Sequence, residues 1–268
     1  MISKKRMVFV FKITAREFVS GQFFWLVLAA QVLATLFLAV VADVALDETA
    51  RMYDTLGYFL TSLTGITAGV FVGSHTWARD FSKSGIGELI CHFDTKPFDL
   101  YLARFVSWAG VLAFFSLIAF TTFGVFLYGF ASERFDFKVI LIMTLFSTIH
   151  SILALSLAQT FGTFLRPALA FIGSFLLLAV GNVSDTLSGV TQLSATEQTR
   201  LPLISRWAVD ILQIWRPEAL VLGQARGVWQ LPSAVEAAKS IGWATSMIIA
   251  FCCIAFFVTQ NRQITERS

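Results

Sequence analysis

Charged residues are scarce in this sequence. Asp, Glu, Lys and Arg make up 14% of the 268 residues, whereas hydrophobic residues make up 56%. A water-soluble domain usually carries roughly 25% charged residues, because charged side chains cover much of its surface. The composition therefore excludes an ordinary soluble protein and indicates that lipid surrounds most of the chain.

The sequence also lacks the short motifs that identify many enzymes and metal proteins. It contains no G-x-x-x-x-G-K-[ST] phosphate-binding loop, no H-E-x-x-H or G-x-S-x-G motif and no C-x-x-C pattern. The three cysteines do not form a disulfide framework. The net charge of +3 is concentrated beside apolar runs, so nucleic-acid binding has no support. We therefore expect no enzymatic activity, bound metal or cofactor in this chain.

Long apolar runs are what the sequence does contain. A bilayer core of roughly 30 Å takes about 20 helical residues, and helices satisfy their own backbone hydrogen bonds in lipid. We therefore predict an all-α, multi-pass membrane protein that forms one transmembrane domain over residues 1–268. Its six predicted transmembrane helices are Phe23–Ala42, Leu56–Gly73, Phe105–Phe130, Val139–Gly162, Pro167–Leu187 and Ile241–Thr259.

Charge at the flanks of the first run predicts its orientation. Basic residues precede this run and mainly acidic residues follow it, and Lys and Arg are retained on the cytoplasmic side. The N-terminus is thus predicted to be inside, and an even number of spans returns the C-terminus to the same side. A signal peptide cleaved after Ala42 is the alternative, but signal-peptide apolar regions usually span only about 7 to 15 residues.

Two predicted extramembrane segments have an amphipathic pattern. Residues 1–21 form an interfacial helix, with Lys12 and Arg16 on its polar face. Residues 188–240 lie outside and contain short helices, with Trp207 and Trp215 on one apolar stripe at the outer interface. Within this segment, Ser233 and Glu236 form a predicted capping box that starts the last helix.

The cytoplasmic loop of residues 74–104 is the main candidate for function. Its apolar residues Ile86, Leu89, Ile90 and Phe93 recur at helical spacing between charged residues. A short amphipathic helix of this kind can dock into a groove on a soluble partner. It can equally cover the cytoplasmic end of the bundle without binding anything, and periodicity does not distinguish these two interpretations.

At this loop the sequence resembles a known family. Gly85-Ile86-Gly87-Glu88-Leu89-Ile90 is similar to the G-T-x-E-L-L segment of ABC-2 type transporter permeases, which have a type V-like exporter fold. The following Leu100, Leu102, Ala103 and Arg104 resemble the family's L-x-L-G-K element. Ala103 and Arg104 replace the usual Gly and Lys, and Asp94 stands where the family commonly has Pro.

The resemblance implies a partner and a mechanism. Family members pair with a cytoplasmic ATPase subunit that binds ATP and Mg²⁺, and a second permease subunit completes a homodimer or heterodimer. The loop then acts as a coupling helix, and the chain is expected to be an exporter subunit in a prokaryotic cytoplasmic (inner) membrane. The residues expected to couple the ATPase to the membrane helices are Gly85, Ile86, Glu88, Leu89, Ile90, Phe93 and Arg104.

Two features within the spans have both a structural and a functional interpretation. Gly65, Gly69 and Gly73 form a ridge that permits close helix packing, within one bundle, at a permease dimer seam or along a translocation route. His150 is a candidate intramembrane polar site, because ionisable residues in spans are often functional. It can also simply donate to a neighbouring backbone carbonyl.

A stand-alone membrane-embedded binding or haem protein is the alternative function. Such a redox protein would use His75, His92 and His150 as axial ligands. Their placement disfavours it, because His75 and His92 lie in or beside the cytoplasmic loop and only His150 lies well inside a span.

Overall fold

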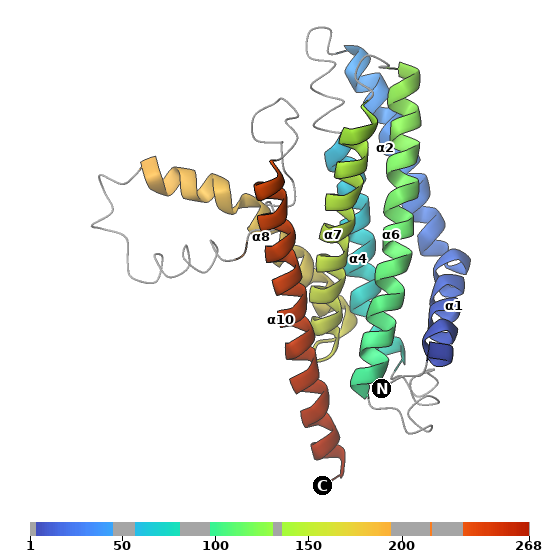
Figure 1. Ribbon diagram of the computed structural model, residues 1–268, viewed down its shortest axis with the longest axis vertical. Coiled ribbons are helices and arrows are strands. Elements are labelled where there is room, and N and C mark those ends of the chain that lie inside the picture. Colours follow the sequence, from blue (N-terminus) through green and yellow to red (C-terminus); the bar gives the residue numbers. More distant parts are fainter. Residues whose placement is uncertain are drawn as a thin grey trace.

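The computed structural model describes residues 4–44, 57–80, 97–130, 136–193, 215 and 233–267, of which nearly all are helical and none lies in a strand (Figure 1). The helices are α1 (Lys4–Ser20), α2 (Gln22–Val44), α4 (Tyr58–Asp80), α6 (Pro97–Phe130), α7 (Phe137–Gly162), α8 (Pro167–Leu193) and α10 (Ala234–Arg267). The all-α prediction is confirmed for this part of the chain, and each of the six apolar runs lies largely within one of these helices.

Within the described ranges, three helical segments are long and apolar enough to cross a membrane. They are Tyr101–Gly129, Phe137–Gly162 and Ala234–Thr259. The bent pair Val8–Ser20 and Phe24–Leu38 makes a fourth if it is counted as one span. The structure thus supports a membrane protein, with three or four of the six predicted spans meeting this criterion.

Helix α4, which falls short of this criterion, has a central position. It contacts α2, α6, α7 and α8, so most of its surface faces protein, and Ala68 and Val70 are fully buried. A helix enclosed by other helices can carry Ser, Thr and Gly, whose small side chains permit close packing. Helix α8 contributes a shorter apolar stretch, Pro167–Gly181.

Helices α1 and α2 meet at an elbow at Gly21. The axes of the two segments differ by 56°. The amide of Gly21 donates to the Phe18 carbonyl at 3.3 Å, and a Cβ on Gly21 would lie 3.0 Å from the Glu17 carbonyl oxygen. Glycine relieves this close approach because it has no side chain. The predicted N-terminal helix therefore leads directly into the first apolar run.

The bundle has one end at which both chain termini lie, which we call the terminal end (Figure 1). Helix α4 finishes at this end and α6 begins there. Helices α4 and α7 run parallel: Gly65 of α4 faces Ser151 of α7, and Gly73, two turns later, faces Ala158.

The capping box at the start of α10 is confirmed. The Ser233 amide donates to Glu236 Oε2 at 3.0 Å, and the Glu236 amide donates to the Ser233 hydroxyl at 3.3 Å. This reciprocal pair satisfies two donors that a helix N-terminus leaves without partners. Helix α10 therefore begins at Ala234, seven residues before the predicted apolar run, and extends to Arg267.

Candidate functional site

The predicted coupling residues fall into two groups in the structure. Six of them lie in residues 81–96, outside the described residues: Gly85, Ile86, Glu88, Leu89, Ile90 and Phe93. The seventh, Arg104, lies in the second turn of α6, just after this segment. The structure therefore describes the helices that flank the segment and the anchoring of Arg104.

Arg104 connects α6 to the N-terminal helix. Its Nη1 donates to the Thr14 hydroxyl at 2.9 Å and to Glu17 Oε2 at 3.2 Å. The Arg104 side chain is 3% exposed and that of Glu17 is 21% exposed. Burying a guanidinium is costly unless a carboxylate balances its charge, and α1 supplies this carboxylate. Arg104 thus fixes α1 against the start of α6.

Apolar contacts extend this junction along α1. Val10, Thr14 and Phe18 are buried at intervals of four residues, so they lie on one helix face. The Phe18 ring packs edge-on against Trp108 of α6, with ring centroids 5.8 Å apart. The helix predicted from the amphipathic pattern is therefore present, and its buried face packs against protein.

The basic residues of α1 lie away from this junction. Lys12 and Arg16 are both exposed, in agreement with their predicted position on a separate polar face. Long basic side chains on such a face can reach lipid phosphates, which keeps their interfacial role a prediction.

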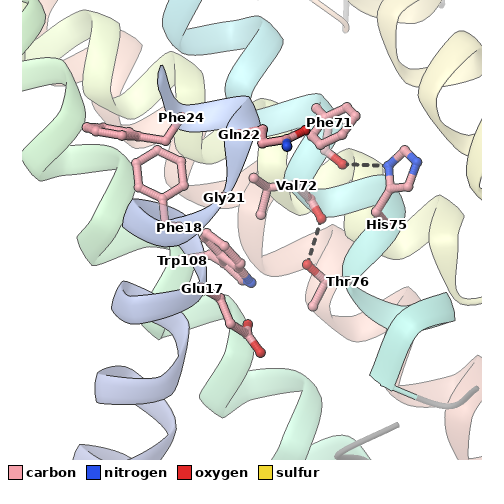
Figure 2. A pocket seen from close by; sticks show the side chains of 10 residues that line it. All are labelled: Glu17, Phe18, Gly21, Gln22, Phe24, Phe71, Val72, His75, Thr76 and Trp108. Carbon is pink, nitrogen blue, oxygen red and sulfur yellow. Dashed lines mark hydrogen bonds between the residues drawn. The ribbon is translucent and has the colours of Figure 1, made fainter. Parts of the chain in front are cut away.

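A cavity of about 200 Å³ adjoins the α1–α6 junction. It lies at the elbow and is bounded by α1, α2, α4 and α6 (Figure 2). Four aromatic rings contribute to its wall, and its polar groups come from Glu17, Gln22, His75, Thr76 and Trp108. The complete lining is Glu17, Phe18, Gly21, Gln22, Phe24, Phe71, Val72, His75, Thr76 and Trp108.

The polar groups around this cavity differ in their hydrogen bonding. Thr76 donates to the Val72 carbonyl at 2.6 Å, and His75 Nδ1 lies 2.9 Å from the Phe71 carbonyl. In contrast, the indole nitrogen of Trp108 is buried and has no hydrogen-bond partner in the described part of the chain. The sequence did not indicate this cavity, because its lining comes from four separate helices.

The glycine ridge of α4 packs against α7 of the same chain. A Cβ on Gly69 would lie 2.5 Å from the Ser151 carbonyl oxygen, and one on Gly73 would lie 2.7 Å from the Leu155 carbonyl oxygen. The two backbones are therefore nearly in contact, which is the helix-packing interpretation of Gly65, Gly69 and Gly73. Because α7 already covers this ridge, it is not a free surface for a dimer seam.

A second polar region lies halfway along the bundle. A Cβ on Gly65 would lie 2.6 Å from the Ser151 hydroxyl and 3.8 Å from the hydroxyls of Ser116 and Ser147. The Ser116 and Ser147 hydroxyls are buried without partners among the described residues. Three helices thus bring three hydroxyl-bearing side chains and a glycine to one place.

His150 lies on the neighbouring face of α7. It is 1% exposed, and neither ring nitrogen has a hydrogen-bond partner in the described structure. Residues one turn away on the same face, Phe146, Leu153 and Ala154, belong to a core cluster shared with α4, α8 and α10. The described residues offer His150 no bond to a backbone carbonyl. No hydrogen bond among them therefore offsets the cost of burying its imidazole.

The other two histidines do not join His150. His75 is exposed on α4, where it stacks on Phe71 with centroids 4.5 Å apart, and His92 lies outside the described residues. No group of three or more His, Cys, Asp or Glu side chains in the described structure could hold a metal ion.

Trp215 differs from its predicted interfacial position, whereas Trp207 lies outside the described residues. Trp215 is 8% exposed, and its indole nitrogen donates to the Leu177 carbonyl of α8 at 2.9 Å. Its ring packs against Trp243 and Phe251 of α10, with centroids 5.8 and 5.9 Å away. Trp215 thus supplies a core contact between α8 and α10, which periodicity alone cannot distinguish from a lipid contact.

Two polar links between helices were missed by sequence reasoning. Gln31 of α2 donates to Thr61 and accepts from Thr64 of α4, both at 2.9 Å. Near the terminal end, the Tyr101 hydroxyl lies 3.2 Å from the Thr160 hydroxyl of α7. Isolated Gln, Tyr and Thr residues in apolar runs give no sequence signal of which residues they meet.

Comparisons with protein-family models, with curated proteins and with solved structures found no match to this chain.

Proposed function

We propose that this chain is the permease subunit of an ATP-binding-cassette exporter, moving its substrate across a prokaryotic cytoplasmic membrane. A separate ATPase subunit binds ATP and Mg²⁺, and a second permease subunit completes the transporter. The proposal rests on the resemblance of residues 85–104 to ABC-2 type permeases, and it includes all six predicted spans with both termini inside.

The position of this segment is the observation that carries the proposal. Its flanks, the end of α4 and the start of α6, lie at the end of the bundle where both termini lie (Figure 1). A soluble ATPase must approach from the cytoplasm, and the basic N-terminus predicts that the terminal end is cytoplasmic. The two helix ends that flank the segment resembling a coupling helix thus lie on the side where the ATPase would dock.

The Arg104 junction supports a route from this segment into the bundle. On this proposal the ATPase contacts residues 85–93 and displaces the start of α6. Because Arg104 is bonded to Thr14 and Glu17, α1 follows this displacement. The elbow at Gly21 then transfers it to α2, so one docking event acts on two helices of the membrane domain.

The proposal is tested by co-purification of a tagged chain in mild detergent. We expect a Walker-motif ATPase to co-purify, with ATP hydrolysis that the permease stimulates. The variant Glu88→Lys should reduce ATPase binding or stimulation. The matched control is Glu133→Lys, because Glu133 stands in the sequence between α6, which ends at the opposite end of the bundle, and α7, which begins there. A chain that purifies without an ATPase, or an unaffected Glu88→Lys variant, would contradict the proposal.

A further inference from the structure

The cavity at the α1–α2 elbow has the form and chemistry of a binding site for a small polar group. Its volume of about 200 Å³ is below the roughly 300 to 1,000 Å³ of most drug-sized ligand pockets. It therefore suits a small molecule or one end of a larger one. This inference does not depend on the proposed transport function.

Trp108 supplies a hydrogen-bond donor that the protein leaves unused. The residue is 4% exposed, and its indole nitrogen has no acceptor among the described residues. An indole N–H can only donate, so it needs an oxygen from a ligand or water. In Figure 2 this nitrogen is directed toward the side of the cavity where the Glu17 carboxylate and the Thr76 hydroxyl lie.

Glu17 and Gln22 supply acceptors in the same cavity. The Glu17 carboxylate is 3.2 Å from Arg104, so its charge is balanced within the protein. A carboxylate has about four lone-pair sites and can accept further donors. Gln22 is exposed and presents an amide at the cavity. The balanced charge disfavours a ligand with a large net charge and favours one that carries both signs.

The aromatic wall favours a cation at the centre of this ligand. Phe18, Phe24, Phe71 and Trp108 line the cavity together with the carboxylate. Aromatic faces and carboxylates both attract ammonium groups. A primary ammonium can also donate hydrogen bonds to Glu17 and Gln22, while an adjacent phosphate oxygen can accept from Trp108.

The surroundings of the cavity indicate where the rest of such a molecule would lie. Large apolar side chains next to the elbow are exposed: Val19 is 51% exposed, Trp25 58% and Leu26 65%. These residues belong to α1 and α2, whose bent pair is apolar enough to count as a span. Acyl chains can cover these side chains while a head group enters the cavity.

We propose that the elbow cavity binds the head group of an amine-bearing zwitterionic phospholipid, phosphatidylethanolamine. The phosphate accepts from Trp108, and the ammonium group donates to Glu17 and Gln22. The lipid thereby fills the space between α1, α2, α4 and α6 and holds the elbow in one conformation.

The test titrates lipids into the full, delipidated chain in detergent and follows thermal unfolding. A lipid that binds the folded chain raises the unfolding temperature in proportion to its affinity. We expect phosphatidylethanolamine to bind at least about tenfold more tightly than phosphatidylglycerol, the factor that one well-placed polar interaction contributes. Equal shifts with both lipids would overturn the proposal.

Variants then locate the site. Trp108→Phe keeps the aromatic wall but removes the N–H group from which the phosphate accepts, so it should weaken phosphatidylethanolamine binding about tenfold. Trp25→Phe is the control, because Trp25 is exposed and does not line the cavity. Glu17→Gln should remove most of the preference over phosphatidylglycerol, because the ammonium group donates to this carboxylate, and Trp108→Phe still decides if that variant fails to fold. An unchanged affinity for phosphatidylethanolamine in Trp108→Phe would place the lipid elsewhere and overturn the proposal.

A soluble ligand with the same chemistry must be distinguished from the lipid. Free phosphoethanolamine carries the same phosphate and ammonium groups without acyl chains. The lipid proposal predicts that millimolar phosphoethanolamine leaves the unfolding temperature unchanged. A shift equal to that of the lipid would overturn the lipid assignment in favour of a soluble phosphorylated amino alcohol.

Discussion

Arg104 carries its charge into the bundle, where Thr14 and Glu17 accept its hydrogen bonds. The sequence singled out Arg104 by its resemblance to a basic residue of a family motif. It could not identify Glu17 as the partner, because the two residues are 87 positions apart. Nothing in the sequence shows which charged residue of α1 pairs with Arg104. The pairing of Arg104 with Glu17 is therefore seen only in the folded structure.

Removing the Arg104 guanidinium should destabilise the chain. Breaking a buried ion pair by deleting one partner costs about 3 to 5 kcal/mol, and the partial exposure of Glu17 reduces this to about 2 to 3 kcal/mol. We therefore expect Arg104→Ala to lower the free energy of unfolding measured by SDS titration. Arg16→Ala, on the exposed face of α1, should change it by less than about 0.5 kcal/mol. Equal effects of the two variants would contradict the buried-pair assignment.

Replacing His150 should change the free energy of unfolding in the opposite direction to replacing Arg104. A buried polar group without a partner costs about 1 to 3 kcal/mol, so His150→Leu should raise the free energy of unfolding by about 1 kcal/mol. Gln31→Leu is the contrast, because Gln31 is equally buried but has two partners and should lose about 1 kcal/mol. If His150→Leu is stabilised yet loses activity, His150 serves function at the expense of stability. A destabilised His150→Leu would indicate a partner that stabilises the native imidazole.

At the scale of elements, local sequence patterns predicted where helices begin better than they predicted which helices pack against each other. The Ser233–Glu236 capping box and the proline at the start of α8 act within one turn of helix, so the sequence contains everything that determines them. The contact surface of α4 is different. Three glycines predict that some helix approaches closely, but the identity of α7 depends on how the bundle assembles.

The α4–α7 contact should tolerate no added methyl group at its centre. A Cβ at Gly69 would lie 2.5 Å from a backbone oxygen, which cannot move without displacing the whole helix. Gly69→Ala should therefore lower the free energy of unfolding by about 1 to 3 kcal/mol. Gly242→Ala in α10 meets nothing within 4 Å and should raise it by up to about 1 kcal/mol, because alanine favours helix. Chemical unfolding of both variants would check these opposite signs.

At the scale of the molecule, composition was sufficient to predict an all-helical membrane protein, because lipid imposes the same requirements on every span. Apolar length alone was a weaker guide to the number of spans. Helix α4 is enclosed by its neighbours and is thereby freed from the need to be strongly apolar.

The arrangement of the bundle predicts which connections share a side of the membrane. Helix α4 ends and α6 begins at the terminal end, whereas α6 ends and α7 begins at the opposite end (Figure 1). In a chain whose native cysteines are replaced, a cysteine at Ser82 should react with a membrane-impermeant maleimide only from the cytoplasmic side. A cysteine at Ser132 should react only from outside. Labelling of both from the same side would contradict the predicted topology.

The spacing of the glycines on α4 gives the contact with α7 a repeating form. Successive glycines are four residues apart, which corresponds to about 6 Å along a helix. The same spacing places Thr61 four residues before the first glycine and Trp77 four residues after the last. An axial displacement of α4 by one repeat would therefore bring one of these larger residues to a position that only a glycine fits against the α7 backbone. The two ends of the glycine ridge thus fix the axial position of α4 along α7.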